Sequence, residues 1–313
     1  PQVIVSGRQL SDLIDEAWLI LRPAAPRLRL FRSASGLVRV VDGESGPVMV
    51  PLGEVEMYGL LAREADWMRR WGQNLIHARP PKDLARDLLA LPDPTLPFLE
   101  AVVTTPVFTP RGDLLTTPGY DPDSRLWYEP TPGFTLPDVP TEPTEDDAAE
   151  AVRLLMEELL VDFPFAAESD EAHALAALLL PFVRRLIPGC APIHLIEAPT
   201  PGSGKGLLAD LISIMARGRA CEATTLTRDE NEARKKITAM LAHGAPIVLV
   251  DNVRNELDSA QLASALTAEV WTDRILGATR MVEFPNRATW LVTANNPKQI
   301  GRASCRERVY HPV

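Results

Sequence analysis

The spacing of hydrophobic residues differs between the first and second halves of the chain. Over residues 8–21 apolar side chains recur at helical spacing, on a face formed by Leu10, Leu13, Ile14, Ala17, Trp18 and Leu21. Pro, Gly and Ser clusters divide the residues that follow into short elements. We predict further helices near 53–70 and 81–91, a hairpin over 27–41, and strands and turns over 100–128. Residues 1–128 are therefore predicted to form a small α+β domain.

A proline-rich acidic segment follows this domain. Residues 129–147 contain five prolines and end in an acidic cluster. Such a segment cannot bury enough apolar surface to pack into a core. We predict an extended linker over 129–147.

Residues 148–299 alternate between helical patterns and short apolar runs. We predict strands at 192–198, 246–252 and 288–296. The apolar run within 246–252 is typical of a buried parallel strand, and 288–296 is also predicted to be buried. Helices are predicted near 148–161, from Ser169 onward, after the first strand to about 217, behind a Thr227/Glu230 capping box, and over 258–271. Strands that alternate with helices predict an α/β fold with a parallel sheet covered on both faces.

Composition narrows the class of protein. Of 313 residues, 46% are hydrophobic and 24% charged, which is ordinary for a soluble globular chain. The net charge of −10 means that any contact with nucleic acid must be local. No apolar run reaches the roughly 18 residues that span a membrane. Three widely spaced cysteines suit a reducing compartment, so we expect a cytoplasmic protein without membrane contact.

The last residues have an unusual sequence. Residues 300–309, IGRASCRERV, match the translation of a common sequencing adapter. We therefore predict that residues 300–313 are a non-native tail and leave them out of the fold prediction. On this interpretation the domain over 148–299 is truncated at its C-terminus.

A glycine-rich loop follows the first apolar strand of the second half. The segment PTPGSGKG, residues 199–206, has the core of a phosphate-binding loop, but Pro199 replaces its first Gly and Gly206 replaces the hydroxyl residue that contacts magnesium. The N–H groups of such a loop cradle phosphate, and its Lys reaches the β and γ groups. The alternative is a turn that binds nothing. The predicted nucleotide-binding residues are Pro201, Gly202, Ser203, Gly204, Lys205, Gly206 and Leu207.

Two later strands end in polar side chains. Asp251 ends an apolar strand, which is where a nucleotide-bound magnesium ion is held. Asn295 follows the next strand and can orient an attacking water or sense the γ-phosphate. Loop, carboxylate and amide come in the order of one ATPase core, so we predict ATP and Mg²⁺ as cofactors.

These motifs resemble those of the AAA+ and superfamily 3 helicases, especially the helicase part of phage and plasmid primase-helicases. PTPGSGKG resembles their Walker A loop, VLVDNV their Walker B strand, and WLVTANNP their sensor 1. The resemblance implies a P-loop NTPase fold of AAA+-like type and a DNA-dependent ATPase that is the helicase module of a mobile element's replication protein. It also implies single-stranded or forked DNA as partner, a homo-oligomeric ring when the chain is full length, and an arginine finger beyond sensor 1.

Two departures from the family pattern concern catalysis. Gly206 offers no hydroxyl to magnesium, and Asn252 stands where many relatives carry the catalytic Glu. Asn can position a water but cannot accept its proton. Glu256 or Asp258 could supply the base, or hydrolysis is slow. The expected catalytic residues are Lys205, Asp251, Asn252 and Asn295; the alternative function is a non-hydrolysing nucleotide-binding module that orders a DNA-loading or assembly surface.

Basic residues near a predicted hairpin are the expected DNA contacts. Residues 274–284 resemble the channel hairpin of superfamily 3 helicases, with Arg280 the first candidate and Arg274 the second. An ordinary surface hairpin is the alternative. Arg234, Lys235 and Lys236 could also contact DNA. The Glu230–Arg234 and Glu232–Lys236 spacings favour a solvated helix face instead. The DEAH string at 170–173 is interpreted as coincidence, and His194 as structural.

Overall fold

A computed structural model describes the chain except residues 45, 227–228, 258, 275–280, 301–305 and 311–313. At 254–257, 296–300 and 306–310 only the backbone is described. The chain divides into two compact units, Pro1–Val102 and Val103–Val313. Each is described by itself.

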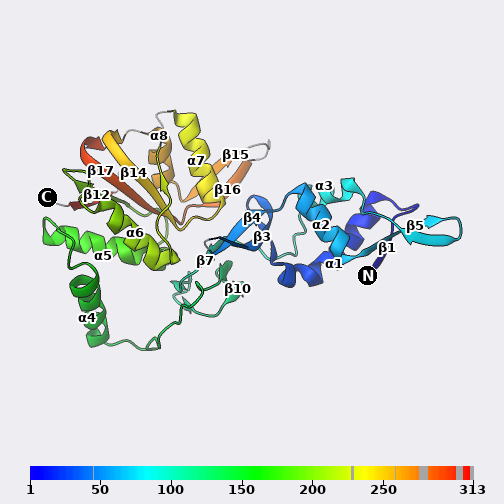
Figure 1. The fold of residues 1–313 in the computed structure, drawn as a ribbon, viewed down its shortest axis with the longest axis horizontal. Helices are drawn as coiled ribbons and strands as arrows, with labels where there is room; N and C mark the ends of the chain where they lie inside the picture. The colour runs from blue at the N-terminus through cyan, green and yellow to red at the C-terminus, as the bar shows by residue number, and fades with distance from the viewer. Residues whose placement is uncertain (45, 227–228, 258, 275–280, 301–305, 311–313) are drawn as a thin grey trace. The chain divides into compact units, whose positions relative to one another are not determined.

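The first unit combines three helices with two small sheets (Figure 1). One sheet is the antiparallel order β2-β3-β4, and the other is β1-β5-β6, in which β1 pairs parallel with β5. The elements are β1 (Gln2–Ile4), α1 (Leu10–Leu28), β2 (Leu30–Ser33), β3 (Gly36–Gly43), β4 (Gly46–Pro51), α2 (Glu54–Glu64), β5 (Asp66–Trp71), β6 (Asn74–His77) and α3 (Lys82–Ala90).

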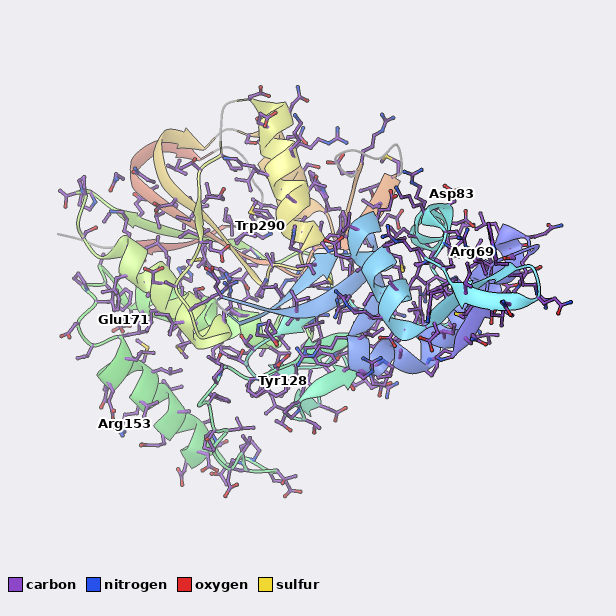
Figure 2. The ribbon with its side chains drawn as sticks, turned by 45° about the vertical axis from the view of Figure 1, so that its right-hand side comes forward. Arg69, Asp83, Tyr128, Arg153, Glu171 and Trp290 are labelled. Atoms are coloured by element: carbon purple, nitrogen blue, oxygen red, sulfur yellow. The ribbon has the colours of Figure 1, made fainter. Side chains whose placement is uncertain are left out.

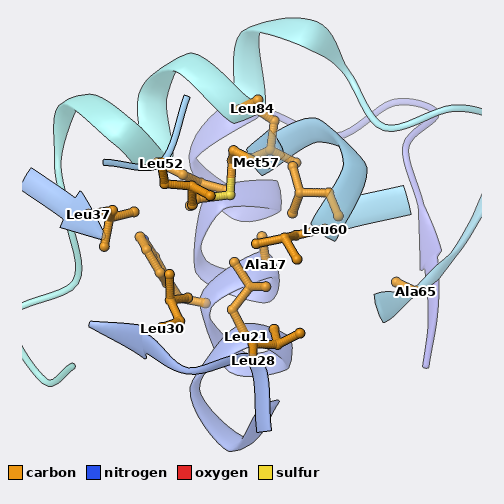
Figure 3. Close-up of a cluster of buried hydrophobic side chains, with 14 of the residues drawn as sticks. Ala17, Leu21, Leu28, Leu30, Leu37, Leu52, Met57, Leu60, Ala65 and Leu84 are labelled. Atoms are coloured by element: carbon orange, nitrogen blue, oxygen red, sulfur yellow. The ribbon is translucent and has the colours of Figure 1, made fainter. Parts of the chain in front are cut away.

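The helices of the first unit share one apolar core (Figure 3). Leu21 from α1, Met57 from α2 and Leu84 from α3 are each fully buried in it. The helix predicted over 8–21 continues through Pro23 and Pro26 to Leu28. Ala25 and Leu28 extend its buried stripe, and this burial outweighs the lost backbone hydrogen bonds.

One predicted helix of the first unit was too long. The segment 53–70 forms a helix only as far as Glu64, and Asp66–Trp71 form strand β5. Trp67 is buried in the strand, and its indole N–H donates to the carbonyl of Leu61 at 2.7 Å. This contact fixes the end of α2 against the beginning of the strand. The hairpin over 27–41 and the helix near 81–91 are confirmed as β2–β3 and α3.

The second unit begins with short strands, earlier than the boundary that the sequence suggested. These strands are β7 (Ala101–Val103), β8 (Val107–Phe108), β9 (Leu114–Leu115), β10 (Gly119–Asp121) and β11 (Leu126–Tyr128). The hydroxyls of Thr104 and Thr105 donate to the carbonyls of Arg217 and Ala216, at 3.0 and 2.8 Å, at the end of helix α6 (Lys205–Arg217). Residues 103–128 therefore belong to the second unit rather than to the first.

Residues 129–143 contain no helix or strand and are largely exposed. Helix α4 (Glu145–Arg153) begins behind Thr144, which forms a capping box with Asp147, and continues as a π-helical turn, η1 (Leu154–Leu159). Helix α5 (Glu168–Val183) begins one residue before Ser169, and the carboxylate of Asp170 accepts from the N–H of Ala167 at 3.1 Å. Asp170, the first residue of the DEAH sequence, therefore has a structural role as a helix cap.

A five-stranded parallel sheet forms the centre of the second unit, with strand order β13-β14-β17-β12-β18. This confirms the predicted parallel sheet with flanking helices. Helices α5 and α6 cover one face of the sheet, and α7 and α8 lie on the other side in Figure 1. The elements are β12 (Ile193–Ala198), α6 (Lys205–Arg217), β13 (Ala223–Thr224), α7 (Glu230–Ala242), β14 (Ile247–Leu257), α8 (Ala260–Thr267), β15 (Val270–Arg274), β16 (Met281–Pro285), β17 (Thr289–Ile300) and β18 (Arg306–Tyr310).

Two boundaries on this sheet differ from the predictions. Helix α7 is capped by Asp229, whose carboxylate accepts from two backbone N–H groups, and Thr227 lies outside the described residues. Helix α8 ends at Thr267, and Trp271 enters strand β15 instead.

Strand β18 comes from the segment predicted to be a non-native tail and pairs with the outer edge of β12. Strand pairing uses backbone groups, so an open sheet edge accepts strands of many sequences.

The burial of His194 in β12 predicts a pH-dependent stability. The residue is 1% exposed, and its pKa is lowered to about 4, mainly by burial and secondarily by His173. As pH falls from 6.5 toward 4, the unfolded chain gains a proton at His194 that the folded chain refuses. The free energy of unfolding should therefore fall over this window, by at most about 1.4 kcal/mol per pH unit.

Urea denaturation of the protein and of His194→Leu at several pH values measures this contribution. The difference in unfolding free energy between the two proteins should change through the window. His77→Leu, at an exposed position, is the matched control and should leave the pH profile unchanged. A difference for His194→Leu that is constant with pH would contradict the prediction.

Candidate functional site

The glycine-rich loop joins the end of β12 to the beginning of α6. Gly202 and Gly204 have φ angles of 81° and 86°, in the left-handed region that favours glycine. A Cβ on Gly202 would meet no heavy atom within 4 Å, so the backbone here faces open space. The loop therefore presents bare backbone directly before the positive end of a 13-residue helix, which is the arrangement that binds anions.

Lys205 is the first residue of α6, and its ammonium turns back over the loop. Its Nζ donates to the carbonyl of Thr200 at 3.0 Å and to the hydroxyl of Ser203 at 2.9 Å. The residue is 8% exposed, and burial lowers its pKa, while the negative charge of Asp251 opposes the shift. One fixed cation thus lies between the loop and the tip of β14.

Strands β14 and β17 bring three polar side chains to the same face and edge of the sheet, where β12 also ends. Ile196, Leu249 and Leu291 pack into the core under α6. Side chains alternate along a strand, so the residues two or four positions farther on lie on that same face. They are Asp251 on β14, and Thr293 and Asn295 on β17. The parallel register pairs Asn295 with Ala198, where the glycine-rich loop begins.

A chain of hydrogen bonds connects these strand ends. The hydroxyl of Thr293 donates to Oδ1 of Asp251 and accepts from the backbone N–H of Asn252 at 2.8 Å. The side-chain amide of Asn295 donates to Oδ1 of Asn252 at 3.3 Å. Thr293 was not predicted to be part of the site. Its position two residues before Asn295, within an apolar strand, is the sequence signal that could have found it.

The backbone of Asn252 adopts a left-handed conformation that could not be predicted from the sequence. Its φ is 55°, and the pairing of β14 with β17 shifts register between Val250 and Val253. Asp251 and Asn252 therefore form a bulge, which re-aims side chains at the end of the strand. Asn is one of the few residue types with a side chain that adopts this backbone region readily. Conformation, and not only chemistry, thus favours Asn at position 252.

The side-chain oxygen of Asn295 is a hydrogen-bond acceptor at this edge of the sheet. Within the part of the chain that the structure describes, Oδ1 of Asn295 is buried and has no hydrogen-bond partner. A buried carbonyl oxygen without a donor costs free energy unless a water or a ligand supplies one. The amide is therefore placed to accept a hydrogen bond from a donor held between the loop and β14.

The arrangement suits an anion and a hard cation together. Backbone N–H groups and Lys205 can bind phosphate oxygens, and Asp251 can bind a metal. Among the described residues no three His, Cys, Asp or Glu side chains form a metal cluster. A cation here would take most of its ligands from water and from the anion, as Mg²⁺ commonly does.

The other predicted loop residues differ in exposure. Pro201, Gly206 and Leu207 are exposed, and Ser203 contacts Lys205. The loop also has an aromatic neighbour, because the ring of Phe163 lies 4.0 Å from the position of a Cβ on Gly204.

The predicted DNA-binding residues are only partly described. Arg280 and the possible base Asp258 lie outside the described residues, and the side chain of Glu256 is not described either. Arg274 is exposed at the end of β15.

The three basic residues of α7 form ion pairs or hydrogen bonds within the protein, but their partners are not the predicted ones. Arg234 pairs with Asp273, Lys235 with Glu232 at 2.6 Å, and Lys236 donates to the carbonyl of Thr225 at 2.8 Å. Glu230 does not pair with Arg234; its carboxylate accepts from the N–H of Gln261 at 2.9 Å.

Comparison with known proteins gives a weak structural likeness. No protein-family profile matches the sequence, and no curated protein matches it. Among solved structures, the chain is similar to the C-terminal region of NrS-1, residues 305–718 in an apo form, with a TM-score of 0.39 and 11% sequence identity. The similarity covers 95% of this chain and 61% of that one, so this chain spans about three fifths of its length. No helix among the described residues is both long and apolar enough to cross a membrane.

The positive φ of Asn252 predicts an asymmetry between two substitutions. Asn252→Gly and Asn252→Val both remove the contact with Asn295. Only Val, which is β-branched, is strained at a φ of 55°. Urea denaturation should show a loss for Asn252→Val that exceeds the loss for Asn252→Gly by at least about 1 kcal/mol. Equal losses would mean that the bulge relaxes to an extended conformation at no cost.

Proposed function

We propose that the second unit is a P-loop ATPase domain of AAA+-like fold that binds ATP with Mg²⁺. One observation carries the proposal: a glycine-rich loop with a buried lysine, a carboxylate and an amide come together at one edge of a parallel sheet. Ligands of open α/β sheets bind at the carboxyl ends of the strands. The loop N–H groups and Lys205 bind the β- and γ-phosphates, Asp251 holds Mg²⁺ through water, and Asn295 senses the γ-phosphate.

The hydrogen-bond chain supports these roles. Thr293 holds one oxygen of Asp251, so the other oxygen remains for a metal-bound water. The free acceptor of Asn295 fits a water or hydroxyl donor beside the γ-phosphate. The burial of Lys205 keeps its charge near the phosphates, where a lower local dielectric strengthens the attraction.

We further propose that the ATPase depends on DNA and is the helicase module of a mobile element's replication protein, acting on single-stranded or forked DNA as a ring of identical subunits. The motif order in the sequence supports this activity.

The second candidate is a module that binds nucleotide without hydrolysing it, and Asn252 favours it. Among the described residues, Asp251 is the carboxylate that the strands bring to this edge of the sheet. Because we assign it to the metal, none of these residues is left to act as the general base.

ATP turnover with and without single-stranded DNA decides between the two candidates. The helicase candidate predicts turnover that rises when DNA is added. The second candidate predicts tight ATP binding by calorimetry with turnover at background in both conditions. A chain that binds no nucleotide would overturn both.

Lys205→Ala tests the phosphate site itself. The change removes the one fixed cation of the loop and keeps its glycines. The affinity for ATP should fall at least about 10-fold, or roughly 1.4 kcal/mol, in isothermal calorimetry. Lys235→Ala, which removes an exposed lysine from α7, is the control and should bind ATP normally. Unchanged affinity in Lys205→Ala would show that the loop is only a turn.

Gly206→Ser tests the position of the missing magnesium ligand. A Cβ on Gly206 meets no heavy atom within 4 Å, so Ser fits without rearrangement. Its hydroxyl should strengthen the affinity for Mg·ATP several-fold, while affinity for ATP in a chelator stays the same. Gly206→Ala separates the hydroxyl from the effect of a side chain on helix stability. Equal gains in Ser and Ala would contradict a metal ligand at this position.

A further inference from the structure

The hairpin of strands β5 and β6 extends from the first unit, with its tip toward solvent (Figure 1). Every residue from 69 to 75 is exposed. The pairing places Arg69 opposite Ile76 and Trp71 opposite Asn74. Side chains directly across an antiparallel pair share a face, so these four residues form one face of the hairpin.

Trp71 is the most exposed large apolar residue of this tip. It is 67% exposed, whereas Trp18 and Trp67 of the same unit are 5% and 3% exposed. The guanidinium of Arg69, labelled in Figure 2, lies 5.6 Å from the centre of its ring. The ring is therefore held by a cation on its own face, and much of its surface is still accessible.

The positive charge of the hairpin is not neutralised. In the first unit most arginines bind carboxylates or carbonyl oxygens, among them Arg8, Arg22, Arg27, Arg29, Arg32, Arg39 and Arg86. Among the described residues of this unit, four arginines form neither an ion pair nor a side-chain hydrogen bond, and all but Arg63 lie in the hairpin or directly after it: Arg63, Arg69, Arg70 and Arg79. The hairpin sequence, residues 66–77, contains a single acidic residue, Asp66, at its base.

We propose that this hairpin binds single-stranded nucleic acid, with a base stacked on Trp71, one phosphate bound by Arg69 on the same face, and a neighbouring phosphate bound by Arg70, which pairs with Leu75 on the opposite face of the exposed tip. Single-strand sites combine an aromatic platform with basic residues along the backbone path. Asn74, across from Trp71, can donate to or accept from the edge of the stacked base. This site lies in the first unit and does not depend on the ATPase proposed for the second.

The shape of the tip favours a nucleic acid strand over a protein. A stable protein interface takes about 20–30 residues from each partner, whereas the exposed tip comprises only residues 69–75. A single strand needs only one ring and two or three charges for each few nucleotides. The net charge of −10 also means that the chain attracts polyanions only where basic residues gather, as they do here.

The test measures binding of a labelled oligodeoxythymidylate of about 20 nucleotides to the whole chain, without ATP, by fluorescence anisotropy at several salt concentrations. Trp71→Ala should weaken binding roughly 10-fold through the lost stacking. Arg69→Gln/Arg70→Gln should reduce the slope of log affinity against log salt by about 1.4, since each phosphate contact on a single strand contributes about 0.7.

Matched controls separate the hairpin from general effects. Arg63→Gln removes an exposed arginine of α2 that has no ion-pair partner among the described residues, and it should change neither affinity nor slope. Trp71→Phe keeps a stacking ring and should retain most of the affinity, whereas a loss equal to that of Trp71→Ala would contradict stacking.

Other ligands decide what kind of strand is bound. Duplex DNA of equal length should bind more weakly, because its bases are already stacked. Oligouridylate distinguishes RNA from DNA as the natural strand by its relative affinity. Equal binding of the unchanged chain and the hairpin variants would overturn the proposal. So would a change in sedimentation of the hairpin variants without a change in oligonucleotide affinity, which would identify a protein-docking tip.

Discussion

The candidate site depends on the parallel pairing of β14, β17 and β12. Parallel strands end at the same edge, and a fixed register decides which residues meet there. Here Leu249 pairs with Leu291, and Ala198 pairs with Asn295. A slip of one residue would turn Asp251 or Thr293 to the opposite face of the sheet. The apolar residues under α6 hold that register, so the core that stabilises the sheet also aligns the polar side chains at its edge.

Burial decides how the charges at this edge behave. Lys205 is nearly buried, and its pKa is lowered by burial although Asp251 opposes the shift. A cation in this position is stabilised by oxygens, and the loop supplies two of them through Thr200 and Ser203. Phosphate oxygens would replace these with charged partners, which form stronger hydrogen bonds. The loop is thus arranged so that binding an anion improves the surroundings of the lysine.

Much of the sheet and of its edge could be predicted from the sequence, because apolar runs and glycine spacing are local signals. The strands around Leu195, Val248 and Leu291 were predicted, as was the helix after Gly204. Strand β5 was not, because helical spacing continues past Glu64 and only the burial of Trp67 ends the helix. The bulge at Asn252 and the role of Thr293 depend on cross-strand register, which one sequence does not contain. The pairs of Arg234 and Glu230 were wrong because partners distant in sequence outcompeted the neighbours on the helix.

The two units differ in net charge. Residues 1–102 carry 12 basic and 13 acidic residues, and residues 103–313 carry 20 and 29. The excess negative charge therefore belongs to the second unit, where it disfavours general contact with a polyanion. The first unit is nearly neutral, and pairing hides most of its arginines. Among the described residues, three of its four arginines without an ion pair or a side-chain hydrogen bond lie in the β5–β6 hairpin or directly after it, so the proposed strand would meet the least neutralised positive charge of this unit at that tip.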